Sequence, residues 1–501
     1  MADLPAELRA FQEEIERYAI EYGLDFYTTV FEVVDFEQMN QLASYGGFPT
    51  RYPHWSFGME YEKLSKSYSY GLSKIYEMVI NNDPVVAYLL KSNSIMDQKL
   101  VMAHVFGHAD FFKNNFYFSN TNRKAIDMMA NHAVRTRRYI EKFGYDRVED
   151  FVDVCLSLET LIDPHGDFMV RDRQEARPDY DPSRVKVPKL KSHRGYMDKF
   201  INPPEYLEEQ KQKLIEEQTK KRRFPEHPVQ DVLSFMIENA PLENWERDVL
   251  TIVREEAYYF LPQAQTKIMN EGWASYWHST IMTRKAMHDS EVIDYADHHS
   301  GTVSMAGGRF NPYKIGIELF RDIEDRWNRG RFGPEYEACT NIQEKQGWNK
   351  NTDLGRKKIF EVRKIYNDVT FLDEFLTPEF CAEHKLFTFQ LNPKSGDYEI
   401  ASREFQKIKQ QLLFQLTNMG RPRIFVVDSN YQNRGELYLC HMQDGPELKM
   451  TTARDTLQNV FKIWRRPVHI QTMLEDQHKL LSFDGKELSD RSLPKEEVIK
   501  I

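Results

Sequence analysis

The chain has 501 residues, a formal net charge of −10 at pH 7, 41% hydrophobic residues and 13% aromatic residues. This composition can build substantial cores and the length suits two or three domains, so a globally disordered chain is excluded. The moderate acidic charge argues against nucleic acid as the main partner. The four cysteines are Cys155, Cys339, Cys381 and Cys440, and none of them has C-x-x-C spacing. Their pattern therefore indicates neither a disulfide framework nor a cysteine zinc finger. Such a pattern fits a reducing compartment.

Residues 1–9 show no basic start followed by an apolar stretch, so the sequence contains no recognisable signal peptide. No later segment has the long uncharged apolar run that a membrane-spanning helix requires. We therefore expect a cytoplasmic protein without a membrane span.

The first ninety residues have the pattern of helices at 7–22, 26–41 and 61–90, the last of them interrupted at 81–84 before Pro84. Between the last two, Gly46 and Gly47 break the chain before a loop dense in aromatic and charged residues. In and after this loop, Arg51, His54 and Glu60 are candidate substrate-binding residues, because a planar guanidinium suits a carboxylate or phosphate and loops often carry binding sites. The alternative is that this loop has a purely structural role and packs against the core.

Residues 100–115 predict a buried helix that carries a pair of histidines, His104 and His108. Four residues are slightly more than one helical turn, so both rings project from one face and can share a metal ion. A buried histidine satisfied by backbone carbonyls or a carboxylate is the competing interpretation.

Helices are also predicted at 122–143 and 146–162, followed by a change of composition at 168–223. Prolines and charged residues recur through this stretch, which is typical of an insertion or linker that covers one side of a domain or a partner surface.

A second buried helix is predicted at 265–278, where Glu271 and His278 fall on one stripe. A carboxylate and an imidazole are costly to bury without a partner, so this segment favours a metal site. Two histidines one turn apart and a glutamate from another helix form a zinc ligand set with a fourth position for water.

In an H-E-x-x-H peptidase, the residue after the first histidine is a glutamate that acts as general base. In this chain, that position is Val105. If the protein is an enzyme, another residue must handle protons. The first candidates are Glu255 and Glu256, which precede the second motif, and His278 and Glu60 come behind them. His298 and His299 are candidates for groups that orient the metal ligands.

Beyond residue 379 the pattern changes to short β-type runs at 386–391, 424–428, 436–441, 468–472 and 479–483, with helices at 402–416 and 451–464. Asp484 and Gly485 predict a hairpin turn. This part has no phosphate loop, nucleophile elbow or metal-ligand spacing, so a docking or regulatory role is expected.

Three long motifs, at 47–61, 104–115 and 265–278, resemble the SpoVR (stage V sporulation protein R) family, with the likeness running from about Leu24 to the C-terminus. The resemblance implies a link to spore cortex formation and, in many bacteria, an association with a PrkA-type serine protein kinase. A weaker resemblance connects the Glu-Gly-Trp-Ala segment at Glu271 with the third ligand of glutamate-zincin peptidases, from which Val105 departs.

We therefore expect a mainly α, zincin-like helical domain at 1–378 that includes the insertion at 168–223, and a smaller α+β domain at 379–501. The leading hypothesis is a zinc-dependent hydrolase of an amide, peptide or peptidoglycan-related substrate, with His104, His108 and Glu271 as ligands. The alternative is a regulatory or scaffold protein with a structural metal and a kinase partner. A dinuclear carboxylate site is a third hypothesis that requires further acidic ligands.

Overall fold

The computed structural model describes residues 4–69, 75–169, 187, 193, 202–220, 224–303, 311–391 and 398–499. Two compact units are present, and each is built from two separate stretches of the chain. The first unit combines Met1–Phe151 with Glu255–Arg421, and the second combines Val152–Arg254 with Pro422–Ile501. None of the described helices combines the length and the apolar character that crossing a bilayer demands.

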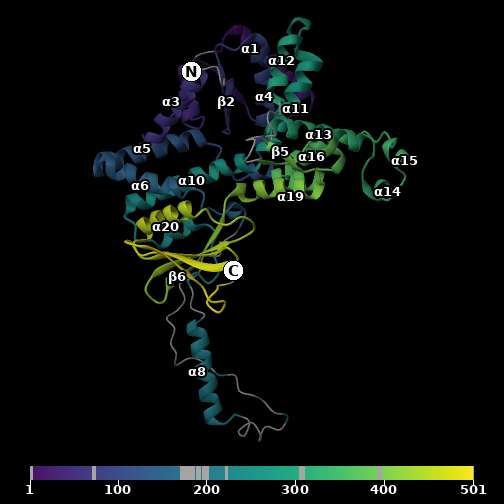
Figure 1. Ribbon diagram of the computed structural model, residues 1–501. Helices are drawn as coiled ribbons and strands as arrows, with labels where there is room; N and C mark the ends of the chain where they lie inside the picture. Colours follow the sequence, from purple (N-terminus) through teal and green to yellow (C-terminus); the bar gives the residue numbers. More distant parts are fainter. Residues whose placement is uncertain are drawn as a thin grey trace. The chain divides into compact units, whose positions relative to one another are not determined.

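The first unit is mainly helical, as Figure 1 shows. In chain order, its helices and strands are α1 (Ala6–Glu21), β1 (Thr29–Val34), α2 (Phe36–Ser44), α3 (Trp55–Ser69), β2 (Glu77–Ile80), β3 (Val85–Leu90), α4 (Ile95–Asn114), η1 (Phe116–Phe118), α5 (Ala125–Phe143), the start of α6 (Tyr145–Ser157), the end of α10 (Asn244–Gln265), α11 (Lys267–Ile281), η5 (Met282–Ala286), η6 (Asp289–Glu291), α12 (Val292–Val303), α13 (Pro312–Asn328), α14 (Gly333–Glu337), α15 (Ile342–Gln346), α16 (Gly355–Ile365), α17 (Asp368–Phe375), α18 (Pro378–Glu383), β4 (Thr388–Leu391), β5 (Tyr398–Ser402), α19 (Phe405–Leu416) and η7 (Thr417–Gly420).

A small sheet of order β1-β3-β2 lies in this helical unit, in a region where the sequence predicts helices. The helical prediction is wrong for residues 29–34, 77–80 and 85–90, which form its three strands. β3 pairs in parallel with β1 and antiparallel with β2, so β2 is an edge strand. Valines are frequent in β1 and β3, and such β-branched residues favour strands when a partner covers them. That pairing joins distant segments, which local periodicity does not reveal.

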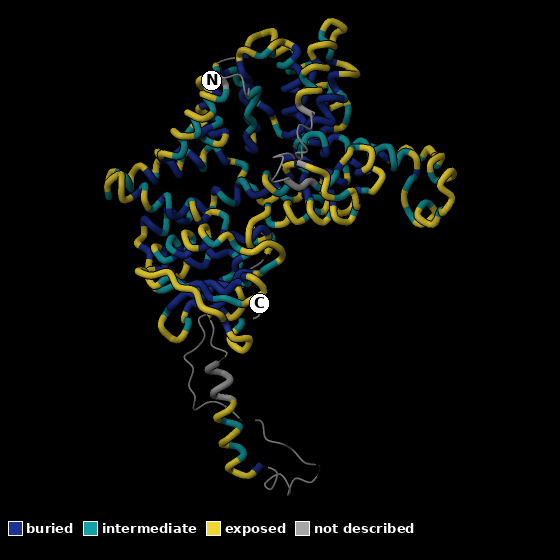
Figure 2. Tube along the Cα trace, viewed as in Figure 1, coloured by how far each residue is buried: buried dark blue, intermediate teal, exposed yellow. Residues whose placement is uncertain are grey.

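The histidine pair lies on α4, which is buried as predicted, and Figure 2 shows its dark blue trace in the core. Ser94 caps its N-terminus, because its hydroxyl accepts a hydrogen bond from the Asp97 backbone N–H. In return, the Asp97 carboxylate accepts a hydrogen bond from the Ser94 backbone N–H. Apart from the half-buried Asp97, the residues from Met96 to Phe112 are all buried. A helix with apolar residues on every side belongs in a core, and α4 occupies the centre of this one.

Two close backbone contacts hold α11 between α4 and α13 (Figure 1). A Cβ at Gly107 of α4 would lie 2.7 Å from the Cα of Ala274 on α11. A Cβ at Gly272 on α11 would lie 2.4 Å from the backbone of Gly316 on α13. The glycines therefore allow three helices to approach closely, and this brings Glu271 towards the histidines.

The second unit contains a sheet of order β10-β9-β8-β7-β6 with α20 packed against β8 and β9. The strands and helices predicted in this part are confirmed, including the hairpin turn, where Gly485 has a φ of +97° between β9 and β10. The described elements are the end of α6, η2 (Gly166–Phe168), α8 (Pro204–Lys220), α9 (Val232–Asn239), the start of α10, β6 (Arg423–Tyr431), β7 (Glu436–Met442), α20 (Met450–Trp464), β8 (Val468–Leu474), β9 (Gln477–Phe483) and β10 (Leu488–Ser492).

The compact units have other boundaries than the predicted division at residue 378/379. The first unit continues to Arg421 because α19 packs on α17, and Phe405, Ile408 and Leu412 join the core around α4. Residues 152–254 belong with the C-terminal sheet, where Val229 and Val426 form a bridge. Most of the predicted insertion lies outside the described residues, apart from α8 and a few neighbouring positions. The coarser prediction of a mainly helical protein with a C-terminal α+β part is confirmed.

Candidate metal centre

His104 and His108 share one face of α4 and both approach Glu271 of α11. The Nε2 atom of each histidine lies 3.5 Å from Oε2 of Glu271, and the three ligand atoms all lie within 4.8 Å of one another. Four-coordinate zinc with bonds of about 2.0–2.1 Å separates its ligand atoms by about 3.3 Å. The three donors therefore fit a single ion after small movements of their side chains.

Polar neighbours fix the orientation of both imidazole rings. Nδ1 of His108 lies 2.9 Å from Oδ1 of Asn270, which accepts the proton of Nδ1 and leaves the lone pair of Nε2 facing Glu271. Nδ1 of His104 lies 2.9 Å from Nδ1 of His278. When Nδ1 of His104 carries the proton of this hydrogen bond, the lone pair of His104 Nε2 also faces Glu271. Such outer partners are typical of histidines that bind metal ions.

The charges of Glu271 and of the two histidines act on one another. Burial acts to raise the pKa of Glu271, but His104 and His108 outweigh it and hold this pKa well below its usual range. Burial acts to lower the pKa of His108, but the Glu271 carboxylate outweighs it and the pKa of His108 is raised. Oε2 of Glu271 has no well-formed hydrogen bond, although the atom is buried. A divalent cation between the rings would satisfy this oxygen and replace the proton of His108.

The centre is shielded but not sealed. The side chains of His104 and His108 are 5% and 9% exposed, and that of Glu271 is 19% exposed.

Burial and the neighbouring His104 hold the pKa of His278 well below its usual range, so this ring is neutral. Its contact with His104 favours an orienting role for His278 over the predicted role in proton transfer.

Two residues near the centre, Glu77 and Tyr313, were not predicted. Glu77 begins β2, and its charge interacts with His104, His108 and Glu271. Burial raises the pKa of Glu77. Tyr313, in the first turn of α13, stacks on His104 with ring centroids 6.4 Å apart. Burial, followed by the charges of Glu271 and Glu77, raises the pKa of Tyr313. The centre thus has a second carboxylate and a phenol beside the three donors.

Asp110, two residues beyond His108, joins three parts of the first unit. Its carboxylate accepts hydrogen bonds from the Trp273 indole at 2.8 Å and from the Asp25 backbone at 2.8 Å, and it pairs with Arg363 at 3.3 Å. Burial, opposed by Arg363, raises the pKa of Asp110 to about 6. This buried network ties α4 to α11 and α16, and it explains the tryptophan that follows Glu271 in the motif.

Asp368 of α17 holds the N-terminus of α11. Its two carboxylate oxygens accept hydrogen bonds from the backbone N–H groups of Ile268 and Met269, at 2.8 and 2.9 Å. These N–H groups belong to the first turn of α11 and have no intrahelical acceptor. Glu271 lies one turn further along the same helix, so Asp368 helps to set its position.

We expect Asp368→Ala to lower the free energy of unfolding by about 2 kcal/mol, because two buried N–H groups lose their acceptor. Burial raises the pKa of Asp368 to about 7. Its protonated form therefore favours the folded state, and its contribution to stability falls as the pH rises from about 4 to 7. Urea unfolding at several pH values measures both effects. Asp373→Ala, an exposed change on the same helix, is the control, and equal stability of the two variants would contradict the assignment.

The predicted bases Glu255 and Glu256 lie in a different cluster, around the buried His132 of α5. His132 contacts Glu255 through Nε2 at 2.9 Å and Glu256 through Nδ1 at 3.1 Å. Arg51 donates to Glu256 at 2.6 Å, and its side chain is 7% exposed. These contacts do not support a role for Glu255 or Glu256 at the centre, nor for Arg51 as a free anion ligand. They favour the structural alternative for this part of the loop.

The other predicted residues divide into two groups. His54 is buried with Nδ1 2.7 Å from the hydroxyl of Ser56, and Glu60 pairs with Lys63 on the surface of α3. His298 binds Asp97 at 2.8 Å and interacts with the charge of Glu77. The ring of His299 packs on His278 with centroids 5.9 Å apart. His298 and His299 therefore lie near the centre, whereas the bonds of His54 to Ser56 and of Glu60 to Lys63 join residues that are close in the chain.

Val105 is completely buried in the core cluster around α4. The side chain at this position therefore packs among apolar residues and cannot transfer a proton. The missing base of the H-E-x-x-H pattern has to be sought on another element.

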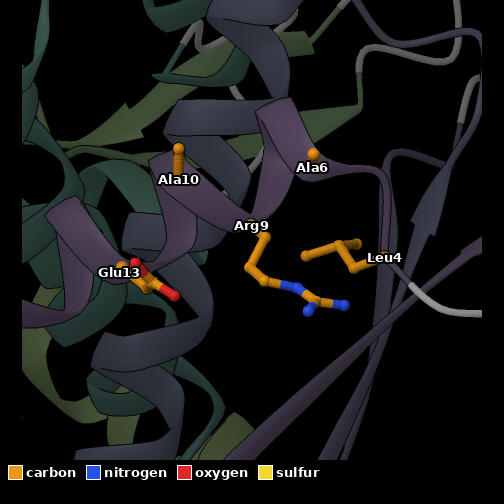
Figure 3. Close-up of a pocket in the computed structure, with 5 residues that line it drawn as sticks. All are labelled: Leu4, Ala6, Arg9, Ala10 and Glu13. Atoms are coloured by element: carbon orange, nitrogen blue, oxygen red, sulfur yellow. The ribbon is translucent and has the colours of Figure 1, made fainter.

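A separate pocket lies beside α1, lined by Leu4, Ala6, Arg9, Ala10 and Glu13 (Figure 3). Figure 3 shows the side chains of Arg9 and Leu4 next to each other at this pocket. It contains neither histidine nor a pair of carboxylates, and we assign no chemistry to it.

Comparison with known proteins gives two family matches. The model of "SpoVR like protein" matches residues 3–421, and that of "SpoVR-like C-terminal domain" matches residues 422–475. The junction coincides with the boundary between Arg421 and Pro422 in the structure. A curated relative, "Uncharacterized protein YcgB" of Escherichia coli (strain K12), is 31% identical over 499 residues, which cover 94% of this chain and 92% of that protein. No solved structure matches the chain.

Proposed function

The chain belongs to the SpoVR family, and we propose that it is a metal-dependent hydrolase that cleaves an amide bond in a peptide or peptidoglycan-related substrate. In this proposal, His104, His108 and Glu271 hold the ion, and zinc is the metal that this donor set suits best. The observation that carries the proposal is the convergence of three donor atoms within 4.8 Å of one another.

The surrounding residues support hydrolysis more than simple storage of a cation. A bound zinc ion supplies a Lewis acid that polarises a carbonyl and activates water. Asn270 and His278 orient the two imidazoles, and α4 and α11 provide rigid support for them. The partial exposure of Glu271 gives a route to the centre. Tyr313 offers a hydroxyl next to the ligands, which suits a hydrogen bond to a developing negative charge.

Metal removal tests the proposed activity. We expect the purified protein with one equivalent of zinc to release cleaved products from a peptide library or from soluble peptidoglycan fragments, as detected by mass spectrometry. Dialysis against a chelator should abolish the products and zinc should restore them, because the donor set alone does not activate water. Zinc binding without any product from either substrate pool would contradict the hydrolase.

A second candidate function is favoured by the buried Val105. In it, the same residues hold a structural metal, and the protein regulates or supports a partner such as a PrkA-type serine kinase. This candidate requires that metal loading raises the stability of the first unit and that the purified kinase binds the chain without cleavage of any substrate. If the zinc-loaded chain binds the kinase and cleaves no substrate, this second function is favoured.

A further inference from the structure

Three polar side chains form a hydrogen-bonded chain across the sheet of the second unit. They are Glu436 of β7, His469 of β8 and Ser482 of β9. The Ser482 hydroxyl lies 2.8 Å from Nδ1 of His469, and Nε2 of His469 lies 2.9 Å from Oε2 of Glu436. A neutral ring can therefore donate its Nε2 proton to the carboxylate and accept the hydroxyl proton at Nδ1. A hydroxyl, an imidazole and a carboxylate joined in this order are the parts of an activated serine nucleophile.

The pairing of the strands places the three groups on one face of the sheet. His469 lies directly opposite Ser482, and Tyr438, two residues after Glu436, lies beside His469. Because side chains alternate between the two faces along a strand, Glu436, His469 and Ser482 project from the same side. Phe483, the next residue of β9, packs on a phenylalanine of α20 with ring centroids 5.1 Å apart. The hydrogen-bonded chain therefore lies on the face of the sheet opposite α20.

Exposure to solvent increases from the carboxylate to the hydroxyl. The side chains of Glu436 and His469 are 8% and 12% exposed, and Ser482 is half-buried. A second pair of this kind in the same sheet joins His441 to the Thr472 hydroxyl at 2.9 Å, but these residues are only 8% and 1% exposed. That pair is closed to a substrate, whereas Ser482 can be reached from solvent while its partners stay shielded.

Neighbouring side chains fix the imidazole and the carboxylate. The ring of Tyr431 packs against His469 with centroids 5.1 Å apart. Nε of Arg434 lies 2.7 Å from Oε1 of Glu436, so the second carboxylate oxygen is also held in place. Burial lowers the pKa of His469, although Glu436 opposes this effect. The ring is therefore neutral, as a proton acceptor has to be.

Arg491 of β10 brings positive charge to the same face. Ser489 lies opposite Ser482, and Arg491 lies opposite Leu480, so these side chains project from one side of the sheet. The Arg491 side chain is 47% exposed and pairs with the exposed Glu497 at 3.0 Å. An exposed ion pair of this kind stabilises a protein little, so the guanidinium can turn towards an anion at Ser482 at small cost. Such a donor suits the negative charge that develops on a carbonyl oxygen under attack.

We propose that the second unit carries an esterase centre of its own, in which Ser482 is the nucleophile, His469 carries the proton and Glu436 is the positioning residue. The substrate class is a carboxylic ester, whose carbonyl oxygen faces Arg491. This centre uses no metal ion, and it does not depend on the proposed function of the histidine and glutamate cluster in the first unit.

The reaction has two steps. In the first step, Oγ of Ser482 forms a bond to the ester carbonyl carbon, and its proton moves to Nδ1 of His469. The bond between that carbon and the alcohol oxygen then breaks, and His469 gives the proton to the leaving alcohol. In the second step, a water oxygen attacks the acyl group on Ser482 and gives one proton to His469. The acyl–Oγ bond breaks, the proton returns to Ser482, and a carboxylic acid is released.

The test uses the full-length chain in the presence of a chelator, so that a metal-dependent reaction cannot contribute. A fluorophosphonate probe, which forms a stable adduct with activated serines, is added, and the modified residue is mapped by peptide mass spectrometry. Hydrolysis of p-nitrophenyl acetate is measured in parallel. The variants are Ser482→Ala and His469→Gln. The matched control is Ser489→Ala, which removes an exposed hydroxyl directly opposite Ser482.

We expect the probe to modify Ser482 of the wild type. Ser482→Ala should remove this adduct and slow ester hydrolysis by about 100-fold or more, because the nucleophile is lost. His469→Gln should slow the modification of Ser482 by about 100-fold, which is typical for the loss of a general base. Ser489→Ala should match the wild type in both measurements.

Glu436→Gln tests the positioning role through the pH profile of the modification rate. The groups that face the His469 ring are Glu436, the hydroxyl of Tyr431 and the cations Arg434 and Arg491. The wild-type rate should fall with pH when His469 becomes protonated. Because Glu436 favours the protonated ring, its replacement should slow the modification and move this fall to a lower pH. A slower reaction with an unmoved profile would show that Glu436 has only a structural role.

Three results would overturn the esterase centre. The first is the absence of an adduct on Ser482 in the wild type, an outcome that does not depend on whether any variant folds. The second is an adduct that forms at the wild-type rate in His469→Gln. The third is ester hydrolysis that persists at the wild-type rate in Ser482→Ala. Replacement of His104 and His108 by alanine should leave the adduct unchanged, so the fate of the metal centre is judged separately.

Discussion

Replacement of both His104 and His108 by alanine is expected to weaken zinc binding on the order of 1,000-fold or more, because two of three protein donors are lost. Glu271 would then face the metal alone, and a single carboxylate holds zinc weakly. Titration with zinc in the presence of a competing chelator measures the loss, and elemental analysis of purified protein gives the stoichiometry. The wild type should contain close to one equivalent.

Binding should also weaken as the pH falls. The pKa of His108 is raised by Glu271, in spite of burial. Zinc needs the neutral ring, so protons compete with the metal from a higher pH than at an ordinary histidine. The control is a double alanine variant of the exposed His165 and His227, which should keep the wild-type affinity. Equal and negligible metal in the wild type and the His104/His108 variant would show that no such centre exists.

The largest expected effect on folding comes from Gly272→Ala. A Cβ at this position would lie 2.4 Å from the carbonyl carbon and the Cα of Gly316, and backbone atoms cannot move aside as a flexible side chain can. We expect a loss of about 3 kcal/mol or more in the free energy of unfolding. In molecules that still fold, α11 must move away from α13, which also displaces Glu271 and lowers zinc affinity.

Gly58→Ala is the control for this prediction. Gly58 lies in α3, and a Cβ there would meet no atom within 4 Å. Since alanine favours helices over glycine, this variant should be slightly more stable than the wild type, by up to about 1 kcal/mol. Urea unfolding of the two variants compares them directly. Similar stabilities for both would show that α11 and α13 are not in close contact.

The sequence predicted the parts of the centre that lie within single helices. His104 and His108 are separated by one turn, and Glu271 lies in a segment of aromatic and small residues, so both segments had local signs of a buried helix with polar groups. The proximity of the two segments did not follow from local pattern. It depends on Gly107 and Gly272, whose role is evident only from the atoms that they contact.

Pairing between distant segments explains what the sequence did not reveal. Residues 77–80 form a strand that pairs with β3. The helical prediction for this segment therefore did not identify Glu77 as a neighbour of the histidine helix. Tyr313 lies 42 positions beyond Glu271 and had no spacing that connects it with the histidines. The sequence predicts a role in proton transfer for Glu255 and Glu256 because they are close to Glu271 along the chain. The side chain of His132, on another helix, engages them instead.

Each compact unit is assembled from two stretches of chain, and this has a consequence for protein synthesis. When the ribosome has made α4, its histidines have no partner, because Glu271 is added more than 160 residues later. The first unit is complete only when Arg421 has emerged, and the second waits for the C-terminal strands. Nascent chains therefore expose the apolar faces of α4 until α11 and α13 have been made, and the proposed metal centre cannot form before Glu271 has left the ribosome.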